Sequence, residues 1–132
     1  MRMLLPVAAA PIGCVEAVSI TADMVPRPRT VPGDTIDVWV EDEARSVLHL
    51  LGEVPEGERA RCLVPGYGLR AHSAHEVLFE VALCFRCEGA PLLGPLVPAE
   101  LRGVQAFDAG SAPCRELLRR FQEAAATADR SR

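Results

Sequence analysis

The chain has 132 residues, of which 49% are hydrophobic and 24% are charged, and its formal net charge is −4. This length is typical of one globular domain that buries about two-thirds of its extended surface. The balance is acidic and the sequence holds one Trp and one Tyr, so we expect no nucleic-acid surface, which needs a basic patch with stacking aromatic side chains. No apolar run is long enough to span a bilayer, so no transmembrane segment is expected.

The N-terminal residues, 1–14, allow two interpretations. An early Arg, an apolar run and a final Cys14 resemble a bacterial lipoprotein signal, after which Cys14 would be lipidated and the rest of the chain exported. However, Pro6 and Pro11 interrupt the apolar run, which is also short for a signal core. We therefore favour an N-terminal arm of a cytoplasmic protein, with the exported lipoprotein as the alternative. In either case residues 15–132 are expected to form a single α+β domain.

Two strands and a helix are predicted in the first half of the domain. Residues 15–22 and 35–40 are predicted to be strands, and apolar and polar residues alternate in the second of them. Residues 24–34 between them are rich in Pro and are expected to form a stiff, extended connection. Three acids at 41–43 suit a helix N-terminus, apolar residues follow at helical spacing, and Gly52 is a natural end point.

A β-hairpin is predicted next, from a strand near 67–71 to a second strand at 77–85, with a turn near 73–74. The second segment is dense in Val, Leu and Phe and contains no Gly or Pro. One of its faces is entirely apolar and is expected to be core. The other face is mixed, includes Glu80, and is expected to be half covered.

Pairing of these two strands is expected to gather Cys62, Cys84 and Cys87 at one end of the hairpin, and three interpretations stay open. In the first, the thiolates bind zinc; Cys84 and Cys87 have zinc-ligand spacing, but a fourth ligand is missing. In the second they carry out thiol redox chemistry, although the helix that activates such motifs is absent. In the third, which we favour, they are small buried hydrophobic side chains and no cofactor is bound.

The residues from Cys62 to Ala71 (CLVPGYGLRA), followed by those from Val81 to Cys87 (VALCFRC), resemble a group of small uncharacterised bacterial proteins. That group shows a Cys, a Pro and a Gly-Leu-Arg-like strand, and then an apolar strand that ends in C-[FY]-x-C. Its members occur both as plain soluble chains and behind lipoprotein-type signals. Many carry a His near the Pro where this chain has Tyr67, which weakens the zinc interpretation. The resemblance supports the hairpin and the cysteine cluster, and it implies no function.

Residues 88–103 contain several Pro and Gly residues and are expected to form a long loop that is not regular throughout. The loop nevertheless holds several apolar residues. Apolar side chains on a long loop mark either a partner-binding surface or a cap folded back over the open end of the sheet. The candidate partner-binding residues are Leu92, Leu93, Leu96, Val97 and Leu101.

Residues 104–107 are predicted to be a last short strand, and an amphipathic helix is predicted to follow from Pro113. The elements then occur in the order β-β-α-β-β-β-α. This order predicts an α+β fold, in which two α-helices pack on one face of an antiparallel β-sheet.

No arrangement of Ser, His and Asp, no zinc-protease motif and no Gly-rich phosphate loop appears in the sequence. An enzyme is therefore the less favoured class. We expect a small non-catalytic binding or accessory protein, for example of immunity type, that acts through an interface with a protein partner. The alternative is a metal-binding or thiol-redox module built on Cys62, Cys84 and Cys87.

Overall fold

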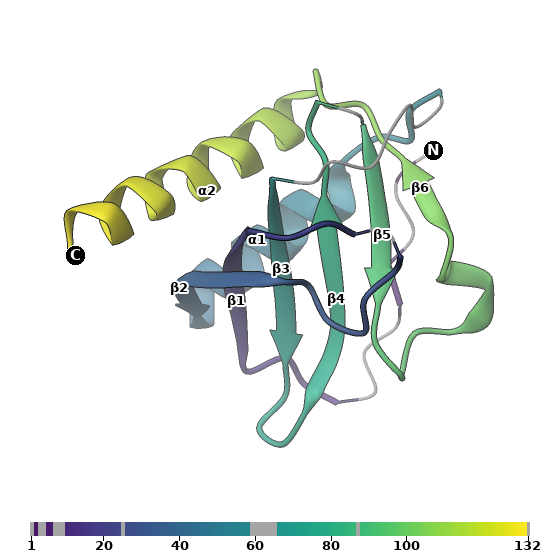
Figure 1. The fold of residues 1–132 in the computed structure, drawn as a ribbon, viewed down its shortest axis with the longest axis horizontal. Helices are drawn as coiled ribbons and strands as arrows, with labels where there is room; N and C mark the ends of the chain where they lie inside the picture. Colours follow the sequence, from purple (N-terminus) through teal and green to yellow (C-terminus); the bar gives the residue numbers. More distant parts are fainter. Residues whose placement is uncertain are drawn as a thin grey trace.

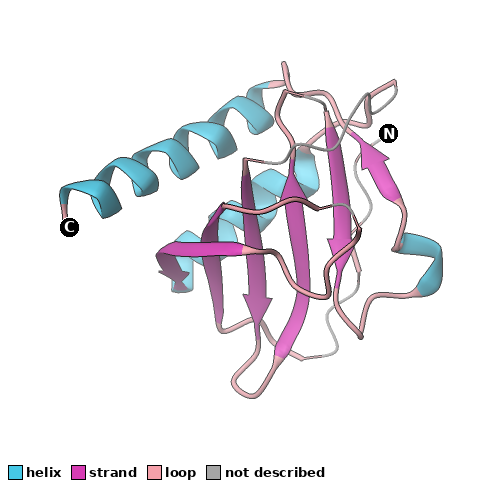
Figure 2. Ribbon diagram, in the orientation of Figure 1, coloured by secondary structure: helices cyan, strands magenta, loops and turns pink. Residues whose placement is uncertain are grey.

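The structure is a computed structural model, and the part of the chain that it describes forms one antiparallel β-sheet and two α-helices (Figures 1 and 2). This arrangement confirms the expected α+β class. The residues that the structure describes are 2, 5–6, 10–24, 26–58, 66–86 and 88–131.

The sheet has six strands in the order β2-β1-β3-β4-β5-β6, so β2 and β6 are its two edges. The strands are β1 (Cys14–Ile20), β2 (Gly33–Val40), β3 (Tyr67–His72), β4 (Val77–Leu83), β5 (Gly89–Leu93) and β6 (Val104–Ala106). The helices are α1 (Glu41–Glu53) and α2 (Ala112–Arg130), with a short 3-10 helix at Ala99–Leu101 before β6.

The predicted hairpin is present as β3 and β4, with a longer turn than expected. His72 pairs with Val77, so the turn spans residues 73–76 rather than two residues. The Ser73 hydroxyl oxygen accepts hydrogen bonds from the backbone N–H groups of His75 and Glu76, at 3.2 and 3.1 Å. This side chain supplies the turn chemistry that an Asn-Gly pair would otherwise provide.

The expectation of an irregular loop is wrong for the first part of residues 88–103. Gly89–Leu93 forms β5, which pairs with β4 on one side and with β6 on the other. Gly and Pro lower the strand propensity of this segment, GAPLL. Burial outweighs propensity here, because all five residues are buried.

The first helix begins directly after β2, without a connecting residue. Glu41 turns the chain, and its φ of 52° lies in the left-handed region. The N-cap residue, Val40, makes no side-chain capping bond, but Glu41, Asp42 and Glu43 place negative charge at the helix N-terminus, where backbone N–H groups lack helical partners. The acids therefore have the role that their position in the sequence predicts.

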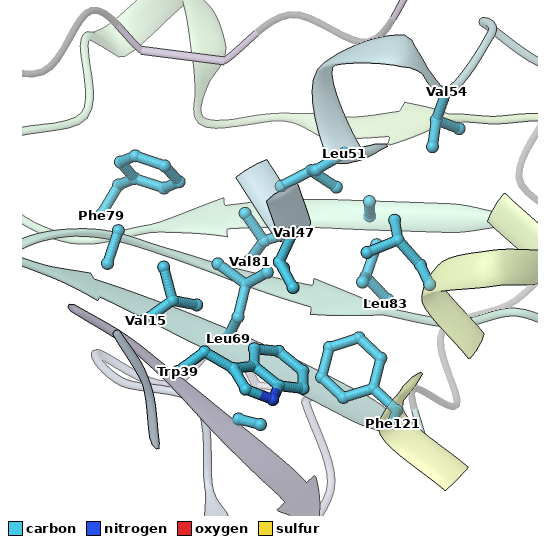
Figure 3. Packing of buried hydrophobic residues seen from close by; sticks show 14 of the residues in the cluster. Val15, Trp39, Val47, Leu51, Val54, Leu69, Phe79, Val81, Leu83 and Phe121 are labelled. Atoms are coloured by element: carbon cyan, nitrogen blue, oxygen red, sulfur yellow. The ribbon is translucent and has the colours of Figure 1, made fainter. Parts of the chain in front are cut away.

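Both helices contribute side chains to one hydrophobic cluster with the sheet. Phe121 of α2 lies near its centre, and its ring contacts those of Trp39 and Tyr67 at centroid distances of 5.5 and 5.1 Å. Figure 3 shows Trp39 and Phe121 side by side, with Val47 and Leu51 of α1 above them. The strand residues of this cluster include Val15, Leu69, Phe79, Val81 and Leu83.

The connection between β1 and β2 crosses the sheet as a strap, which we define as residues 21–24 and 26–32. Figure 1 shows it in front of β3 and β4, with α1 behind the sheet. Met24 and Val31 of the strap are buried in a second cluster with Ala82 of β4. A Cβ atom on Gly68 would lie 2.7 Å from Val31 Cγ1, so glycine at this position lets the strap lie close to β3.

Truncation of Phe121 tests the position of the core. Phe121→Ala is expected to lower the free energy of unfolding by about 3–5 kcal/mol, because it removes a buried ring and leaves a cavity. Chemical denaturation followed by circular dichroism measures this value. Leu96→Ala is the control, since Leu96 is 43% exposed and its loss should cost less than about 0.5 kcal/mol. A similarly small loss in both variants would contradict this core.

Candidate functional site

Of the three cysteines predicted to cluster, Cys84 lies within the described residues. Cys84 follows β4 directly and is buried, and its backbone N–H donates a 2.9 Å hydrogen bond to the carbonyl of Gly89. Cys62 and Cys87 lie outside the described residues, so the zinc and thiol-redox interpretations stay predictions. Within the described ranges, no three His, Cys, Asp or Glu side chains are gathered as a metal ion would require.

The other two described cysteines differ in environment. Cys14 is the first residue of β1 and is partly exposed, and its lipidation stays a prediction. Cys114 lies on the buried side of α2, where burial, together with the charges of Asp108 and Glu88, raises the pKa of its thiol to about 12. This thiol is therefore protonated at neutral pH, and it packs as a small hydrophobic side chain.

The five candidate partner-binding residues do not form an exposed apolar surface. Leu92, Leu93 and Val97 are buried, Leu101 is partly buried, and Leu96 is exposed. A partner-binding role for these residues stays a prediction, although most of their side chains pack within the chain. The physical reason is that β5 lies inside the sheet, between β4 and β6, so its leucines pack within the chain.

A ladder of three charged side chains crosses the sheet beneath the strap. Glu16 of β1, Arg70 of β3 and Glu80 of β4 lie directly opposite one another in the strand register. Arg70 Nη1 lies 2.9 Å from Glu16 Oε2, and Arg70 Nε lies 3.0 Å from Glu80 Oε1. One guanidinium therefore bridges two carboxylates across three neighbouring strands.

The same ladder holds the strap against the sheet. Glu80 Oε1 accepts hydrogen bonds from the Thr30 hydroxyl, at 2.6 Å, and from the backbone N–H of Val31, at 2.9 Å. Arg70 Nη2 donates to the carbonyl of Val31 at 2.6 Å. Because Glu80 is only 4% exposed, its charge requires these partners, and the strap supplies two of them.

At the other end of the ladder, Glu16 has two further partners. The Thr35 hydroxyl donates a hydrogen bond to Glu16 Oε2, and His72 Nε2 lies 2.9 Å from Glu16 Oε1. Burial by itself raises the pKa of Glu16, but these hydrogen bonds and the positive charge of Arg70 outweigh it. The pKa of Glu16 is therefore below its ordinary value of 4.5, and the carboxylate is charged at neutral pH.

The ladder has the character of a structural network rather than of a reaction centre. Its acids and its base are bonded to one another and to the strap, and within the described residues every buried side-chain N or O has a hydrogen-bond partner. Sequence reasoning missed this network. The signal that could have found it is Glu80 in the middle of an apolar strand, because a carboxylate there needs a partner.

Among the described residues, none pairs with the outer edge of β2, and a groove lies beside this strand. β2 is an edge strand, and its residues Val38 and Val40 are 51% and 50% exposed. A groove of about 730 Å³ is lined by residues of both β2 and α2, and Figure 1 shows that α2 runs past β2. The residues that line the groove include Ile36, Trp39, Arg120, Ala124 and Thr127.

An acidic side chain occupies one of the backbone hydrogen-bond donors of β2. The N–H of Val38 donates a 2.8 Å hydrogen bond to the carboxylate of its neighbour Asp37. An incoming strand has to compete with this carboxylate for the donor. Charged residues on edge strands commonly prevent unselective pairing, so Asp37 limits which segments can bind here.

Comparison with known protein families, with curated proteins and with solved structures finds no match to this chain. None of the described helices is long and apolar enough to cross a membrane. The function therefore has to be inferred from the geometry of the ladder, the strap and the edge of β2.

Removal of the central cation tests the ladder. Arg70→Met is expected to lower the free energy of unfolding by about 3 kcal/mol, because it leaves the buried carboxylate of Glu80 without its cation. The control is Arg45→Met, since Arg45 is exposed and pairs with Asp42 on the surface of α1, and its loss should cost less than about 0.5 kcal/mol. Hydrogen exchange at the Val31 amide should quicken in Arg70→Met only; unchanged exchange there would show that the ladder does not hold the strap.

The pH dependence of stability tests the charge on Glu16. The pKa of Glu16 is lower in the folded chain than its ordinary value of 4.5. The contribution of the Glu16 carboxylate to the unfolding free energy is therefore present above that pH, and it is lost as the pH falls through the folded pKa. Glu16→Gln should therefore flatten the fall in unfolding free energy between about pH 5 and pH 3. Denaturation at a series of pH values measures this, and an equally steep fall in the variant would refute the assignment.

Proposed function

We propose that this protein is a small non-catalytic binding protein that docks an extended, basic segment of a protein partner along β2. The observation that carries the proposal is the free edge of β2 beside the groove at α2. A segment that adds to a sheet edge gains main-chain hydrogen bonds, and its alternate side chains contact the two faces of the sheet.

The two faces of an added strand would meet different surfaces. On one face, the exposed side chains of Val38 and Val40 offer apolar contact. On the other face, side chains of the segment would enter the groove between β2 and α2. In this proposal both helices pack on one face of the sheet, so that α2 forms the outer wall of the groove.

The charges of the edge favour a basic partner. Asp34 and Asp37 lie exposed on β2, and the acids of residues 41–43 follow directly. A Lys or Arg of the incoming segment would pair with Asp37 and free the N–H of Val38 for a carbonyl of the partner. An acidic segment would be repelled by these carboxylates. A neutral segment would leave the hydrogen bond from the Val38 N–H to Asp37 in place, so that donor would not be available to it.

The same charges disfavour pairing between two copies of this chain through β2. Antiparallel pairing centred on Asp37 would set that carboxylate against its own copy. Pairing centred between Thr35 and Ile36 would set Asp34 against Asp37. Like charges directly opposite each other destabilise a strand pair, so we infer that the occupant is a different protein.

Selection from a library of random peptides displayed on phage tests the class of partner. Selected peptides are expected to alternate apolar residues with Lys or Arg. Titration of the chain with the best peptide should shift the NMR signals of the backbone amides of β2 and α2. Val38→Lys should weaken binding of the best peptide at least about ten-fold, since it removes an apolar contact and repels a basic segment. Val104→Lys on β6 is the matched control, because Val104 is 47% exposed on the opposite edge.

Two outcomes would overturn the proposal. One is a selection in which the enriched peptides do not alternate apolar residues with Lys or Arg. The other is an equal loss of affinity in Val38→Lys and Val104→Lys. Thermal unfolding of both variants is measured alongside, because a side chain exposed at an edge should tolerate Lys without loss of the fold.

A further inference from the structure

A second hollow lies beside β5, and β1, β3 and β4 separate it from β2. It has a volume of about 560 Å³ and lies between the strap and the turn that follows β5. Residues of three separate segments form its walls. They include Arg27, Arg29, Leu92, Leu93, Pro95 and Arg102.

The hollow concentrates positive charge in an acidic chain. Among the described residues that line it, three are Arg and none is Asp or Glu, whereas the whole chain has a net charge of −4. Within the described residues, Arg27, Arg29 and Arg102 form no ion pair. Their charges are therefore available to a ligand.

Two of these guanidinium groups are anchored by neutral carbonyls. Arg27 Nη2 donates to the carbonyl of Leu92, and Arg102 Nε donates to the carbonyl of Val97 at 3.0 Å. A carbonyl orients the side chain but does not cancel its charge. Because a guanidinium has five N–H donors, each group keeps donors for a ligand. Such donors bind phosphate and carboxylate oxygens through strong, charge-assisted hydrogen bonds.

The remaining wall of the hollow is largely apolar. Leu93 packs in the strap-side cluster, Pro28 and Pro95 add further apolar lining, and Leu92, whose side chain packs in the other cluster, presents its backbone carbonyl to Arg27. The chain turns at Gly94, whose φ of 123° is readily adopted by glycine. An apolar group attached to the anion would therefore be removed from water when the ligand binds.

We propose that this hollow binds a small molecule that carries one phosphate or carboxylate group on a short apolar body. Nucleic acid is a poorer fit, since the lining residues that the structure describes include no aromatic side chain that could stack on a base. The strap supplies Arg27 and Arg29, so the bonds of Val31 to the ladder also position this site. The inference does not depend on the proposed partner at β2.

Titration of the full-length, ¹⁵N-labelled chain with hexyl phosphate, hexanoate and inorganic phosphate tests the site. At least one of the two amphiphiles should shift the amides of residues 92–94 saturably and bind at least about ten-fold more tightly than inorganic phosphate, because its chain buries apolar surface. The stronger of the two identifies the anionic group. Saturable shifts from neither amphiphile would overturn the proposal.

Arg29→Gln is the informative variant, because within the described residues the Arg29 side chain makes no hydrogen bond whose loss would disturb the fold. It should weaken binding of the preferred amphiphile about ten-fold, which corresponds to the loss of a charge-assisted contact. Arg45→Gln on α1 is the matched control and should bind as the natural chain does. Equal affinity in Arg29→Gln and the natural chain would overturn the assignment of the hollow.

Discussion

The guanidinium of Arg70 lies between the carboxylates of Glu16 and Glu80, and the arrangement on this face of the sheet depends on it. It connects β1, β3 and β4 through side chains, and it reaches the strap through the carbonyl of Val31. A buried charge network adds little net stability, because desolvation offsets much of the attraction. Its larger effect is on register, since a slip by one residue would turn Arg70 to the other face of the sheet.

The strap divides this face of the sheet into a covered part and an exposed part. Its residues Met24 and Val31 join a hydrophobic cluster with β4 and β5. At β2, by contrast, Val38 and Val40 stay exposed. Because the ladder holds the strap, and the strap lines the arginine hollow, the ladder sets the position of that hollow. The exposed valines of β2 lie on the other side of β1.

Opposite charges mark the two proposed sites. The edge of β2 carries acids, and the hollow beside β5 carries three arginines without acidic neighbours among its lining residues. A basic segment and a small anion would therefore be attracted to different ends of the sheet. Three strands separate the two proposed sites, so the two proposals do not compete for the same surface.

The sequence by itself determined the elements whose signals are local. Alternation along β2, the apolar run of β4 and the amphipathic stripe of α2 depend on residues a few positions apart, and these elements overlap their predicted ranges, with ends that differ by one or two residues. β5 was missed because its Gly and Pro oppose a strand, and its burial comes from neighbouring strands. Only the tertiary structure decided the ladder, the strap and the hollow. Glu80 meets Thr30 across 50 positions of the chain, and the packing of the strap on the sheet is what brings the two together.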